Sequence, residues 1–553
     1  MRMFHVKHKS EEHELKTNDV LDLAVTGYTS DGEGVARSNG EVVFIPGAIA
    51  GETVRARIVN VGKTCAHGKI EKILSASSHR VKPACPDFPD CGGCDFWHMD
   101  YEEERRLKRQ RVIDALARIG GVEIAELPMH GAPRCEGYRN KVQFPVAAQN
   151  GRAVAGFFRA RTHEVIPVQS CRIQPECAGR VRAAVLSWME QYRIRAYDER
   201  SHTGYIRHIY LRVGEKTGQL LVCVVANCEN LPKKAQLCQT ILAAEPDITS
   251  IVVSYNTKRG NTVLGPREEV LHGPGQIEDE LLGLRFRLSA RSFYQVNHDQ
   301  AERLYEKALE FAALDKTQTA LDLYCGTGTI TLCLARKAGK AIGVEVVDAA
   351  ILDAKQNAAR NRIENVEFFC ADASEAAKRF AASGIRPDVI VVDPPRKGVS
   401  LDVVEAMTQM APARIVYVSC DPATLARDIR LLTQRGYRFE TAEAFDLFPR
   451  CAHVETVCLL VRRNSLHIDI YVDVEEMLQE KRGQATYPQI KEYVLEHSGL
   501  KVSNLYIAQV KQKCGIIERE NYNKPKSQEA KRPQCPPEKE EAIKEALRHF
   551  GMI

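Results

Sequence analysis

At 553 residues the chain exceeds the roughly 250–300 residues at which a single hydrophobic core stops growing, so it should divide into about three or four domains. A composition of 44% hydrophobic and 27% charged residues is ordinary for a soluble globular protein and excludes the disordered and fibrous classes. The formal net charge of +5 permits a nucleic-acid partner without requiring one, so such a function must rest on local clusters.

A small β-barrel is predicted over residues 17–75, after a flexible segment at residues 1–16. Short runs of Val, Ile and Phe alternate there with Gly, Asp and Asn turn signals, as in DGEGVAR and VFIPGAIAGETVRARI. This text resembles the TRAM domain, an OB-like RNA-binding barrel that is often fused to RNA-modifying enzymes. An unrelated small barrel is the alternative.

A cysteine-containing loop and a basic helix open the next region, residues 76–290. The loop CPDFPDCGGC precedes YEEERRLKRQRVIDALARIGG, in which Leu107, Ile113 and Leu116 recur at loosely helical spacing. Strand-like text then dominates, in YRNKVQFPV, GFFRARTHEVIPV, IRHIYLRV and QLLVCVVAN. We expect a central domain of mixed α and β structure.

Strands and helices alternate over residues 291–463. The apolar runs ALDLY, AIGVEV, VEFFC, VIVVD and RIVYVSC are separated by helical text. This alternation predicts an α/β fold with a Rossmann-like parallel sheet, which binds its ligands at the carboxyl ends of the strands.

A C-terminal helical extension is predicted over residues 464–553. The segments TYPQIKEYVLEHSG and VSNLYIAQVKQKCG permit a helix-turn-helix with a nucleic-acid ligand. A helical cap without a ligand is the alternative.

A Gly-rich turn follows the first strand of the α/β region, in ALDLYCGTGT. Gly326 and Gly328 allow a tight turn and a close approach of the backbone to a ligand. A dinucleotide site would normally have a third glycine where Ile-Thr follows here, which weakens an NAD interpretation. Glu345 ends the second strand, where it could bind both ribose hydroxyls, and Asp372 follows the third strand near the expected adenine position. The set resembles the cofactor site of S-adenosylmethionine-dependent methyltransferases.

The loops that end the fourth and fifth strands, DPPRKG and SCDPATLARD, carry a candidate nucleophile, Cys420. Carbon 5 of uracil is a poor nucleophile, but a thiolate added at carbon 6 makes an enolate that can attack a methyl sulfonium. We expect the N-terminus of the helix PATLARD to lower the pKa of Cys420. Arg427 is a secondary candidate for support.

A general base must remove the carbon 5 proton before the thiol can leave. Glu455 in HVETV is the candidate, because its strand should lie next to the fifth strand; His453, on the same face by strand alternation, is the alternative. In a purely structural interpretation, Cys420 is an inert buried thiol, Glu455 a surface acid and Asp393 a helix N-cap.

The motifs SFYQVN, LDLYCGTGT, DPPRKG, SCDPATLARD and HVETV, in this order, resemble the RNA (uracil-5-)-methyltransferase family, and the resemblance covers residues 17–463. It implies methyl transfer from S-adenosylmethionine to carbon 5 of a specific uridine, with Cys420 as nucleophile and Glu455 as base. Positions that contact the cofactor in the family are matched by Gln295, Tyr324, Glu345 and Asp393. Thr329 stands where some members have Asn.

Two other functions remain open. Enzymes that methylate an exocyclic amine typically follow Asp-Pro-Pro with an aromatic residue, whereas Arg396 stands here. A non-catalytic RNA-binding or assembly factor could retain the same fold, although intact Cys420 and Glu455 favour catalysis.

Three cysteines of the loop before the basic helix, Cys85, Cys91 and Cys94, have the spacing Cys-x5-Cys-x2-Cys, and Cys171 offers a fourth thiolate. Four thiolates suit either a [4Fe-4S] cluster or zinc, and spacing does not decide between them. The family resemblance includes an iron–sulfur cluster on this pattern and so favours the cluster, with zinc as the lesser alternative. Most of the other cysteines are expected to be reduced core residues.

The target base of a folded RNA must be unstacked or flipped into the pocket. Arg139 and Lys141, next to Tyr138, and Arg159 and Arg161 in FFRARTH are candidates for phosphate contacts, although each could be a solvated charge. The resemblance favours 23S ribosomal RNA as the partner, with tRNA as the alternative. No apolar run reaches the about 18 residues of a membrane span, so we expect a cytoplasmic protein without a membrane partner, and a monomer.

Overall fold

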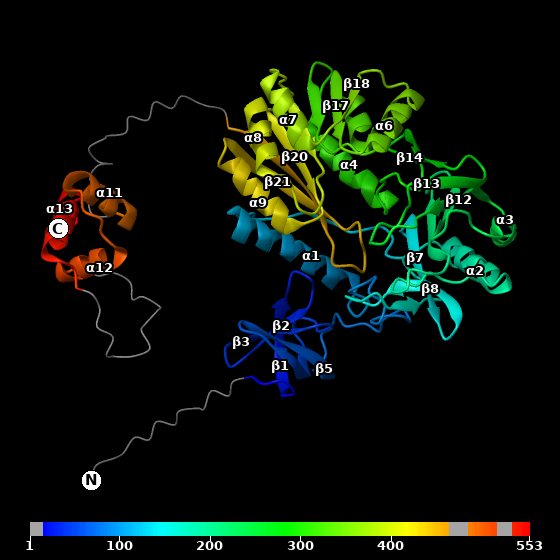
Figure 1. The fold of residues 1–553 in the computed structure, drawn as a ribbon, viewed down its shortest axis with the longest axis horizontal. Helices are drawn as coiled ribbons and strands as arrows, with labels where there is room; N and C mark the ends of the chain where they lie inside the picture. Colours follow the sequence, from blue (N-terminus) through cyan, green and yellow to red (C-terminus); the bar gives the residue numbers. More distant parts are fainter. Residues whose placement is uncertain (1–14, 464–484, 517–533) are drawn as a thin grey trace, which may run out of the picture. The chain divides into compact units, whose positions relative to one another are not determined.

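The computed structural model describes residues 15–463, 485–516 and 534–553. The chain divides into two compact units, residues 1–463 and 464–553 (Figure 1). A flexible N-terminal segment is expected at residues 1–16, and residues 1–14 of it lie outside the described residues. Among the helices of the described ranges, none is long and apolar enough to cross a membrane.

The first five strands close into a barrel in the order β1-β2-β3-β5-β4, drawn in blue in Figure 1. Strand alternation fills its interior: in β4, Val54, Ala56 and Ile58 are fully buried while Arg55 and Arg57 point outward. The expected N-terminal barrel is therefore confirmed. The strands are β1 (Val20–Tyr28), β2 (Gly34–Ser38), β3 (Glu41–Ile45), β4 (Thr53–Val61) and β5 (Cys65–Ser75).

The central region contains a seven-stranded sheet in the order β13-β12-β11-β10-β7-β8-β9. All seven residues of β11 are buried, because Val222 and Val224 pack with helices α2 and α3 while Cys223 and Val225 face the core of the next sheet. Both faces of this strand are therefore covered. The elements are β7 (Lys141–Gln149), β8 (Arg152–Phe158), β9 (Val165–Pro167), α2 (Glu176–Gln191), β10 (Ile206–Val213), β11 (Leu220–Ala226), α3 (Lys234–Ala244), β12 (Ile248–Tyr255) and β13 (Arg267–His272), with the hairpin β14 (Ile277–Leu281) and β15 (Leu284–Leu288) after them.

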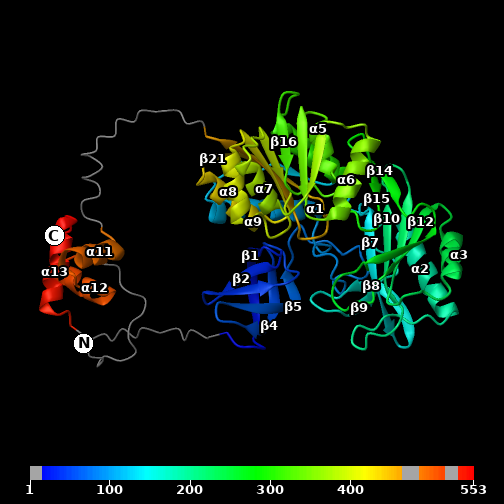
Figure 2. The same cartoon turned by 45° about the horizontal axis from the view of Figure 1, so that its top comes forward.

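The catalytic sheet has the order β18-β17-β16-β19-β20-β22-β21-β6. Strands β16 to β20 are parallel, and β22 lies antiparallel beside β20, as expected for the strand that carries Glu455. Helices α4, α5 and α6 pack in one core and α7, α8 and α9 in another, so both faces are covered (Figure 2). This confirms the expected Rossmann-like α/β fold.

The elements of this sheet and its helices are α4 (His298–Ala312), β16 (Thr319–Asp322), α5 (Thr329–Ala335), β17 (Lys340–Glu345), α6 (Asp348–Arg360), β18 (Val366–Cys370), α7 (Ala373–Ala382), β19 (Val389–Val392), α8 (Leu401–Met410), β20 (Arg414–Ser419), α9 (Pro422–Thr433), β21 (Tyr437–Phe445) and β22 (Glu455–Arg462).

A segment that the sequence assigns to the central domain also packs into the catalytic domain. Helix α1 (Tyr101–Ala115) begins at Asp100, whose carboxylate accepts a hydrogen bond from the Glu103 amide, and a π-helical turn, η1 (Leu116–Gly120), continues it. Val112 and Leu116 lie in the same hydrophobic core as α9. The short strand β6 (Met129–His130) then pairs with β21.

The C-terminal unit contains helices α11 (Tyr487–Ser498), α12 (Asn504–Lys513) and α13 (Pro537–His549). A turn of five residues that begins with Gly499 joins α11 to α12, and Ile490, Ile507 and Ile543 meet in their shared core. The expected helical extension is thus present in the described residues. Its role as a nucleic-acid-binding helix-turn-helix stays a prediction.

Candidate active site

A pocket of about 760 Å³ opens at the carboxyl ends of the catalytic strands, where a doubly wound sheet places its ligands. Its volume suits a ligand of cofactor size. Nearly all of the predicted cofactor and catalytic residues meet there. The lining includes Gln295, Tyr324, Gly326, Thr329, Glu345, Asp372, Asp393, Cys420 and Glu455.

Gly328 is the predicted cofactor residue that does not line the pocket. Its φ is +86°, and a Cβ there would lie 3.2 Å from the Cβ of Ala354 in α6 and 3.3 Å from Phe368 Cζ in β18. Glycine is therefore required by the turn and by close packing of the neighbouring helix and strand. Gly326, also at positive φ (+52°), has open space above it, as a ligand-facing glycine should.

The two acidic residues of the cofactor side are held by backbone amides. Glu345 accepts hydrogen bonds from the amides of Gly326 at 3.2 Å and Val347 at 2.9 Å. Asp372 caps α7 by accepting from the Ser374 amide at 2.9 Å. These contacts orient both carboxylates at the mouths of their strands while leaving acceptor capacity for a ligand.

The positions of Cys420 and Glu455 follow from the antiparallel pairing of β20 with β22. Ser419 pairs with Thr456, so the next residues toward the pocket on the two strands are Cys420 and Glu455. Cys420 is half-buried, and Glu455 is only 4% exposed. The geometry brings a thiol and a carboxyl group to the same wall of the pocket.

The expected lowering of the Cys420 pKa by the helix N-terminus is not found. Burial, together with the charges of Glu455 and Asp393, raises the pKa of this thiol to about 11, and only Arg396 opposes the shift appreciably. The amides at the start of α9 are occupied, because Asp421 accepts hydrogen bonds from Ala423 at 3.0 Å and Thr424 at 2.9 Å. A capping carboxylate cancels the positive end of the helix that the thiolate would have used.

The two candidate bases differ in basicity. Burial, and then Asp393, raises the pKa of Glu455 to about 8. Burial and several cations, Arg396 first among them, lower the pKa of His453 to about 4. His453 Nε2 accepts a hydrogen bond from Arg396 Nη2 at 2.9 Å, so its lone pair is already engaged. The carboxyl group is therefore the stronger base of the two.

Arg427 lies behind the pocket. Its guanidinium binds the Asp428 carboxylate at 2.8 Å and the carbonyls of Lys397 at 2.9 Å and Val399 at 3.3 Å. It thus braces the loop after Asp-Pro-Pro. Asp393, the first residue of Asp-Pro-Pro, is not a helix N-cap, since Ser400 caps α8. Burial and Asp322 raise the pKa of Asp393 to about 7.

Sequence reasoning missed three aromatic residues of the pocket. Phe293 lines it with 60% of its surface exposed, Phe448 lies edge-on to His453 at 5.8 Å, and the buried Tyr305 contacts both Gln295 and Thr329. The motif SFYQVN contained a signal for Phe293, because an aromatic residue next to a cofactor position is poorly explained by core packing. Phe448 lies in a loop without a recognisable motif.

The four predicted metal ligands line a second, smaller cavity of about 230 Å³, together with Phe88 and Trp97. Cys85, Cys91, Cys94 and Cys171 all lie around this space, and their role as metal ligands stays a prediction. Within the described residues, however, no group of three or more His, Cys, Asp or Glu side chains is arranged to hold a metal ion. A fifth thiol, Cys451, contacts Cys94 and donates to the Gly93 carbonyl at 3.2 Å.

The candidate RNA contacts are dispersed. Arg139 and Lys141 line the cysteine cavity, and burial lowers the pKa of Lys141 to about 8. Arg159 is paired with Asp90 at 2.7 Å and Glu164 at 2.9 Å. Arg161, whose side chain is 83% exposed, has the most accessible cationic group of the four.

Comparisons with known proteins agree with this architecture. Residues 268–463 match the family model of tRNA (Uracil-5-)-methyltransferase, and residues 14–70 match the TRAM domain. An RNA methyltransferase of Clostridium tetani is 41% identical over 446 residues, covering 81% of this chain and 97% of its own, and one of Halalkalibacterium halodurans is 42% identical over 448 residues, covering 81% and 98%. The crystal structure of Pyrococcus abyssi tRNA (uracil-54, C5)-methyltransferase with S-adenosyl-L-homocysteine superposes with a TM-score of 0.65 at 25% identity, covering 80% of this chain and all of that one.

The sheet order, the pocket at its carboxyl edge and these matches define an S-adenosylmethionine-dependent methyltransferase with an RNA-binding barrel. The chain belongs to the RNA (uracil-5-)-methyltransferase family, and its methyl acceptor is RNA.

Proposed function

We propose that this enzyme methylates carbon 5 of a specific uridine in 23S ribosomal RNA, through a covalent bond between Cys420 and carbon 6 of the uracil. One observation supports the mechanism above all others. A thiol and a buried carboxyl group end two adjacent strands and line the same pocket as the glycine and acidic residues of the cofactor side.

Cys420 begins the reaction. Its Sγ, once deprotonated, adds to carbon 6, and the electron pair of the carbon 5–carbon 6 double bond moves into an enolate. Carbon 5 then takes the methyl group from the sulfonium of S-adenosylmethionine, which leaves as S-adenosylhomocysteine. Because the pKa of the thiol is about 11, the thiol passes its proton to water as Sγ attacks carbon 6, and the nearby cation Arg396 favours the thiolate.

Glu455 completes the reaction. Its carboxylate removes the proton from carbon 5, the double bond re-forms, and the bond between Sγ and carbon 6 breaks to release the methylated RNA. A carboxyl group with a pKa near 8 is basic enough to take this proton and is still partly ionised at neutral pH. His453, with its pKa of about 4, is poorly suited to the role.

Aromatic and cationic side chains around these two groups suit a flipped base. The exposed ring of Phe293 offers a stacking face, and Phe448, which also lines the pocket, packs edge-on against His453. Nucleobases taken out of a stack are commonly held between such faces. Arg161, exposed on the central region, is our candidate for a phosphate contact.

The cysteine cavity is the proposed site of a [4Fe-4S] cluster. Zinc needs its four ligands within about 2.3 Å of one point, whereas each thiolate of a cluster binds a different iron. The four cysteines line one cavity, and the Cys-x5-Cys-x2-Cys pattern of the family that the chain resembles favours the cluster over zinc. When bound, the cluster would cross-link the loop of Cys85 to Cys94 with Cys171 and so stiffen this region.

The choice of 23S ribosomal RNA rests on the combination of the TRAM barrel with the four-cysteine pattern in the family that the chain resembles. A tRNA target is the second candidate, because the solved structure with the TM-score of 0.65 is named as a tRNA (uracil-54, C5)-methyltransferase.

Release of tritium from RNA labelled at carbon 5 of uridine tests both parts of the proposal. Unmodified 23S ribosomal RNA and unmodified tRNA would be compared, each with and without S-adenosylmethionine. Donor-dependent release from ribosomal RNA supports the proposal, release from tRNA alone would reassign the substrate, and no release from either would exclude methylation at carbon 5.

A further inference from the structure

The loop between β21 and β22, residues Asp446 to Val454, is called the anchored loop here. It contributes Phe448 and His453 to the pocket and ends immediately before Glu455. Phe448, His453 and Glu455 all line the pocket. Glu455 is therefore held by the pairing of β22 with β20 and β21 and, on the side that precedes it in the chain, by this loop.

Donors from distant parts of the chain bind six backbone carbonyls of the anchored loop. The residues of this loop are buried or half-buried, so its carbonyls need partners within the protein. The bonds are Gln300 Nε2 to Asp446 at 3.1 Å, Asn297 Nδ2 to Leu447 at 3.1 Å, Lys108 Nζ to Phe448 at 3.1 Å, Tyr138 Oη to Pro449 at 3.0 Å, the Asp95 amide to Arg450 at 2.7 Å and Arg111 Nη1 to Ala452 at 2.8 Å.

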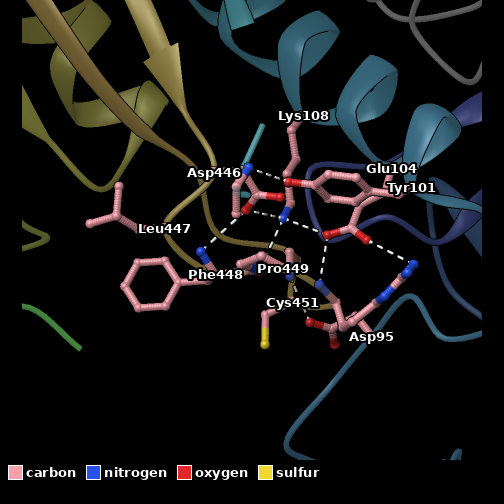
Figure 3. Close-up of polar contacts among 12 residues, drawn as sticks. Asp95, Tyr101, Glu104, Lys108, Asp446, Leu447, Phe448, Pro449 and Cys451 are labelled. Carbon is pink, nitrogen blue, oxygen red and sulfur yellow. Dashed lines mark hydrogen bonds and ion pairs between the residues drawn. The ribbon is translucent and has the colours of Figure 1, made fainter. Parts of the chain in front are cut away.

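Lys108 is at the centre of this arrangement (Figure 3). Its ammonium group is fully buried and donates to Glu104 Oε1 at 2.7 Å, to Asp446 Oδ1 at 2.8 Å and to the Phe448 carbonyl at 3.1 Å. An ammonium has three donors, so all three are used, and two of them hold the anchored loop. Lys108 thus connects α1 to the first turn of the loop.

The charges around Lys108 balance. Glu104 also accepts from the Arg450 amide at 2.7 Å, and its second oxygen lies 3.4 Å from the Arg450 guanidinium. Two cations, Lys108 and Arg450, therefore meet two carboxylates, Glu104 and Asp446. A buried network of this kind is a costly way to gain stability, since apolar residues usually serve as well, but its hydrogen bonds restrict the geometry of the side chains that make them.

We propose that Lys108 is a positioning residue for Glu455: by fixing Asp446 and the Phe448 carbonyl it sets the position of the base for proton removal. The inference rests on the proposed covalent mechanism. Lys108 does not line the pocket, and it donates a hydrogen bond to the backbone carbonyl of the pocket residue Phe448. Its loss should slow the step that needs Glu455 and spare both the binding of the methyl donor and the addition of Cys420.

The test compares turnover of natural RNA with adduct formation on RNA containing 5-fluorouridine, in which carbon 5 carries fluorine in place of the proton that Glu455 removes. In Lys108→Met we expect turnover to fall at least about tenfold, because a displaced catalytic group loses rate steeply. Formation of the 5-fluorouridine adduct and the Kd for S-adenosylhomocysteine should stay within about twofold to threefold, because both depend on sites outside the network.

Two further variants separate positioning from stability. Lys108→Met combined with Asp446→Asn removes one charge of each sign and leaves Glu104 paired with Arg450, so it should fold even if the single variant does not, and it should show the same selective loss of turnover. Lys307→Met is the matched control: Lys307 joins a helix to β21 through Glu443 at 3.1 Å, away from the anchored loop, and should retain turnover.

Equal losses of turnover, adduct formation and S-adenosylhomocysteine binding in the balanced double variant would show a general structural role and overturn the proposal. So would normal turnover in that variant. A wild-type enzyme that methylates natural RNA but forms no adduct on 5-fluorouridine RNA would overturn the covalent mechanism, and the positioning role with it.

Discussion

Ser419 and Thr456 are cross-strand partners in the antiparallel pair of β20 and β22, and the next residues along the two strands, Cys420 and Glu455, face one pocket. The pairing sets the thiol and the carboxyl group side by side, although 35 positions of sequence separate them. Burial and the nearby charge of Glu455 raise the pKa of Cys420, whereas burial and the charge of Asp393 raise the pKa of Glu455.

Replacing the thiol tests the nucleophile. Cys420→Ala should lower turnover on the order of 10⁴-fold or more, as expected for removal of an attacking group. The half-buried side chain supports little packing, so the melting temperature and the Kd for S-adenosylhomocysteine should be nearly unchanged. Substantial residual methylation in a properly folded variant would contradict the covalent mechanism.

Replacing the base should trap the intermediate. Glu455→Gln keeps the shape of the side chain but cannot accept the carbon 5 proton, so a covalent complex of protein and methylated RNA should accumulate and survive denaturing electrophoresis. Glu405→Gln, an exposed acid of α8, is the control and should give no complex. A Glu455→Gln enzyme that turns over normally would direct attention to another base.

The pKa of Glu455 has consequences for stability as well as for rate. Because burial raises this pKa from 4.5 to about 8, the folded state holds the proton more tightly than the unfolded state. The stability that this tighter proton binding adds to the folded state is fully present below about pH 4.5 and is lost as pH rises through about 8. As pH rises across this interval, the melting temperature of the wild-type protein should therefore fall relative to that of Glu455→Gln.

Over the same interval the turnover of the wild-type enzyme should increase, since only the carboxylate accepts a proton. Measured melting curves and initial rates between pH 5 and about 9 check both trends. Parallel stability profiles for wild type and Glu455→Gln would show that the carboxyl group ionises normally.

The cofactor side can be tested without RNA. Glu345→Ala should weaken binding of S-adenosylhomocysteine by about 10-fold to 100-fold, the usual range for losing hydrogen bonds to a charged group. Glu367→Ala is a matched control, because Glu367 lies on the neighbouring strand β18 and pairs with Lys340 at the surface. Isothermal titration calorimetry distinguishes the two variants, and equal affinities would remove Glu345 from the ligand site.

The proposed cluster in the cysteine cavity can be tested by measuring bound metal. Protein purified without oxygen should be brown and contain about four irons, and Cys171→Ser should lose most of the iron. Cys177→Ser should retain it, because Cys177 follows six positions later and lies outside the cavity. A colourless wild-type protein with one zinc would refute the cluster.

The features predicted correctly from sequence are those encoded by residues close together along the chain. Strand and helix alternation predicted the Rossmann-like fold, and the residues that end its strands, such as Gly326, Glu345 and Cys420, had to meet at one edge. Other features depend on contacts that no motif contains. Asp421 takes the helix N-terminus that Cys420 was expected to use, and Lys108 meets Asp446 across 338 positions of the chain.

The packing of α1 and β6 bears on how such an enzyme can be divided. The chain looks modular, yet the loop between β21 and β22 is bound by α1, and β21 pairs with β6. Both α1 and β6 precede β16, the first parallel strand of the catalytic sheet, by about two hundred residues. A fragment beginning at the methyltransferase motifs would keep the cofactor residues and lose the supports of the loop before Glu455. The smallest fragment that works as an enzyme is therefore larger than the catalytic domain. If N-terminal domains are swapped between relatives, α1 must stay with the catalytic sheet that it supports.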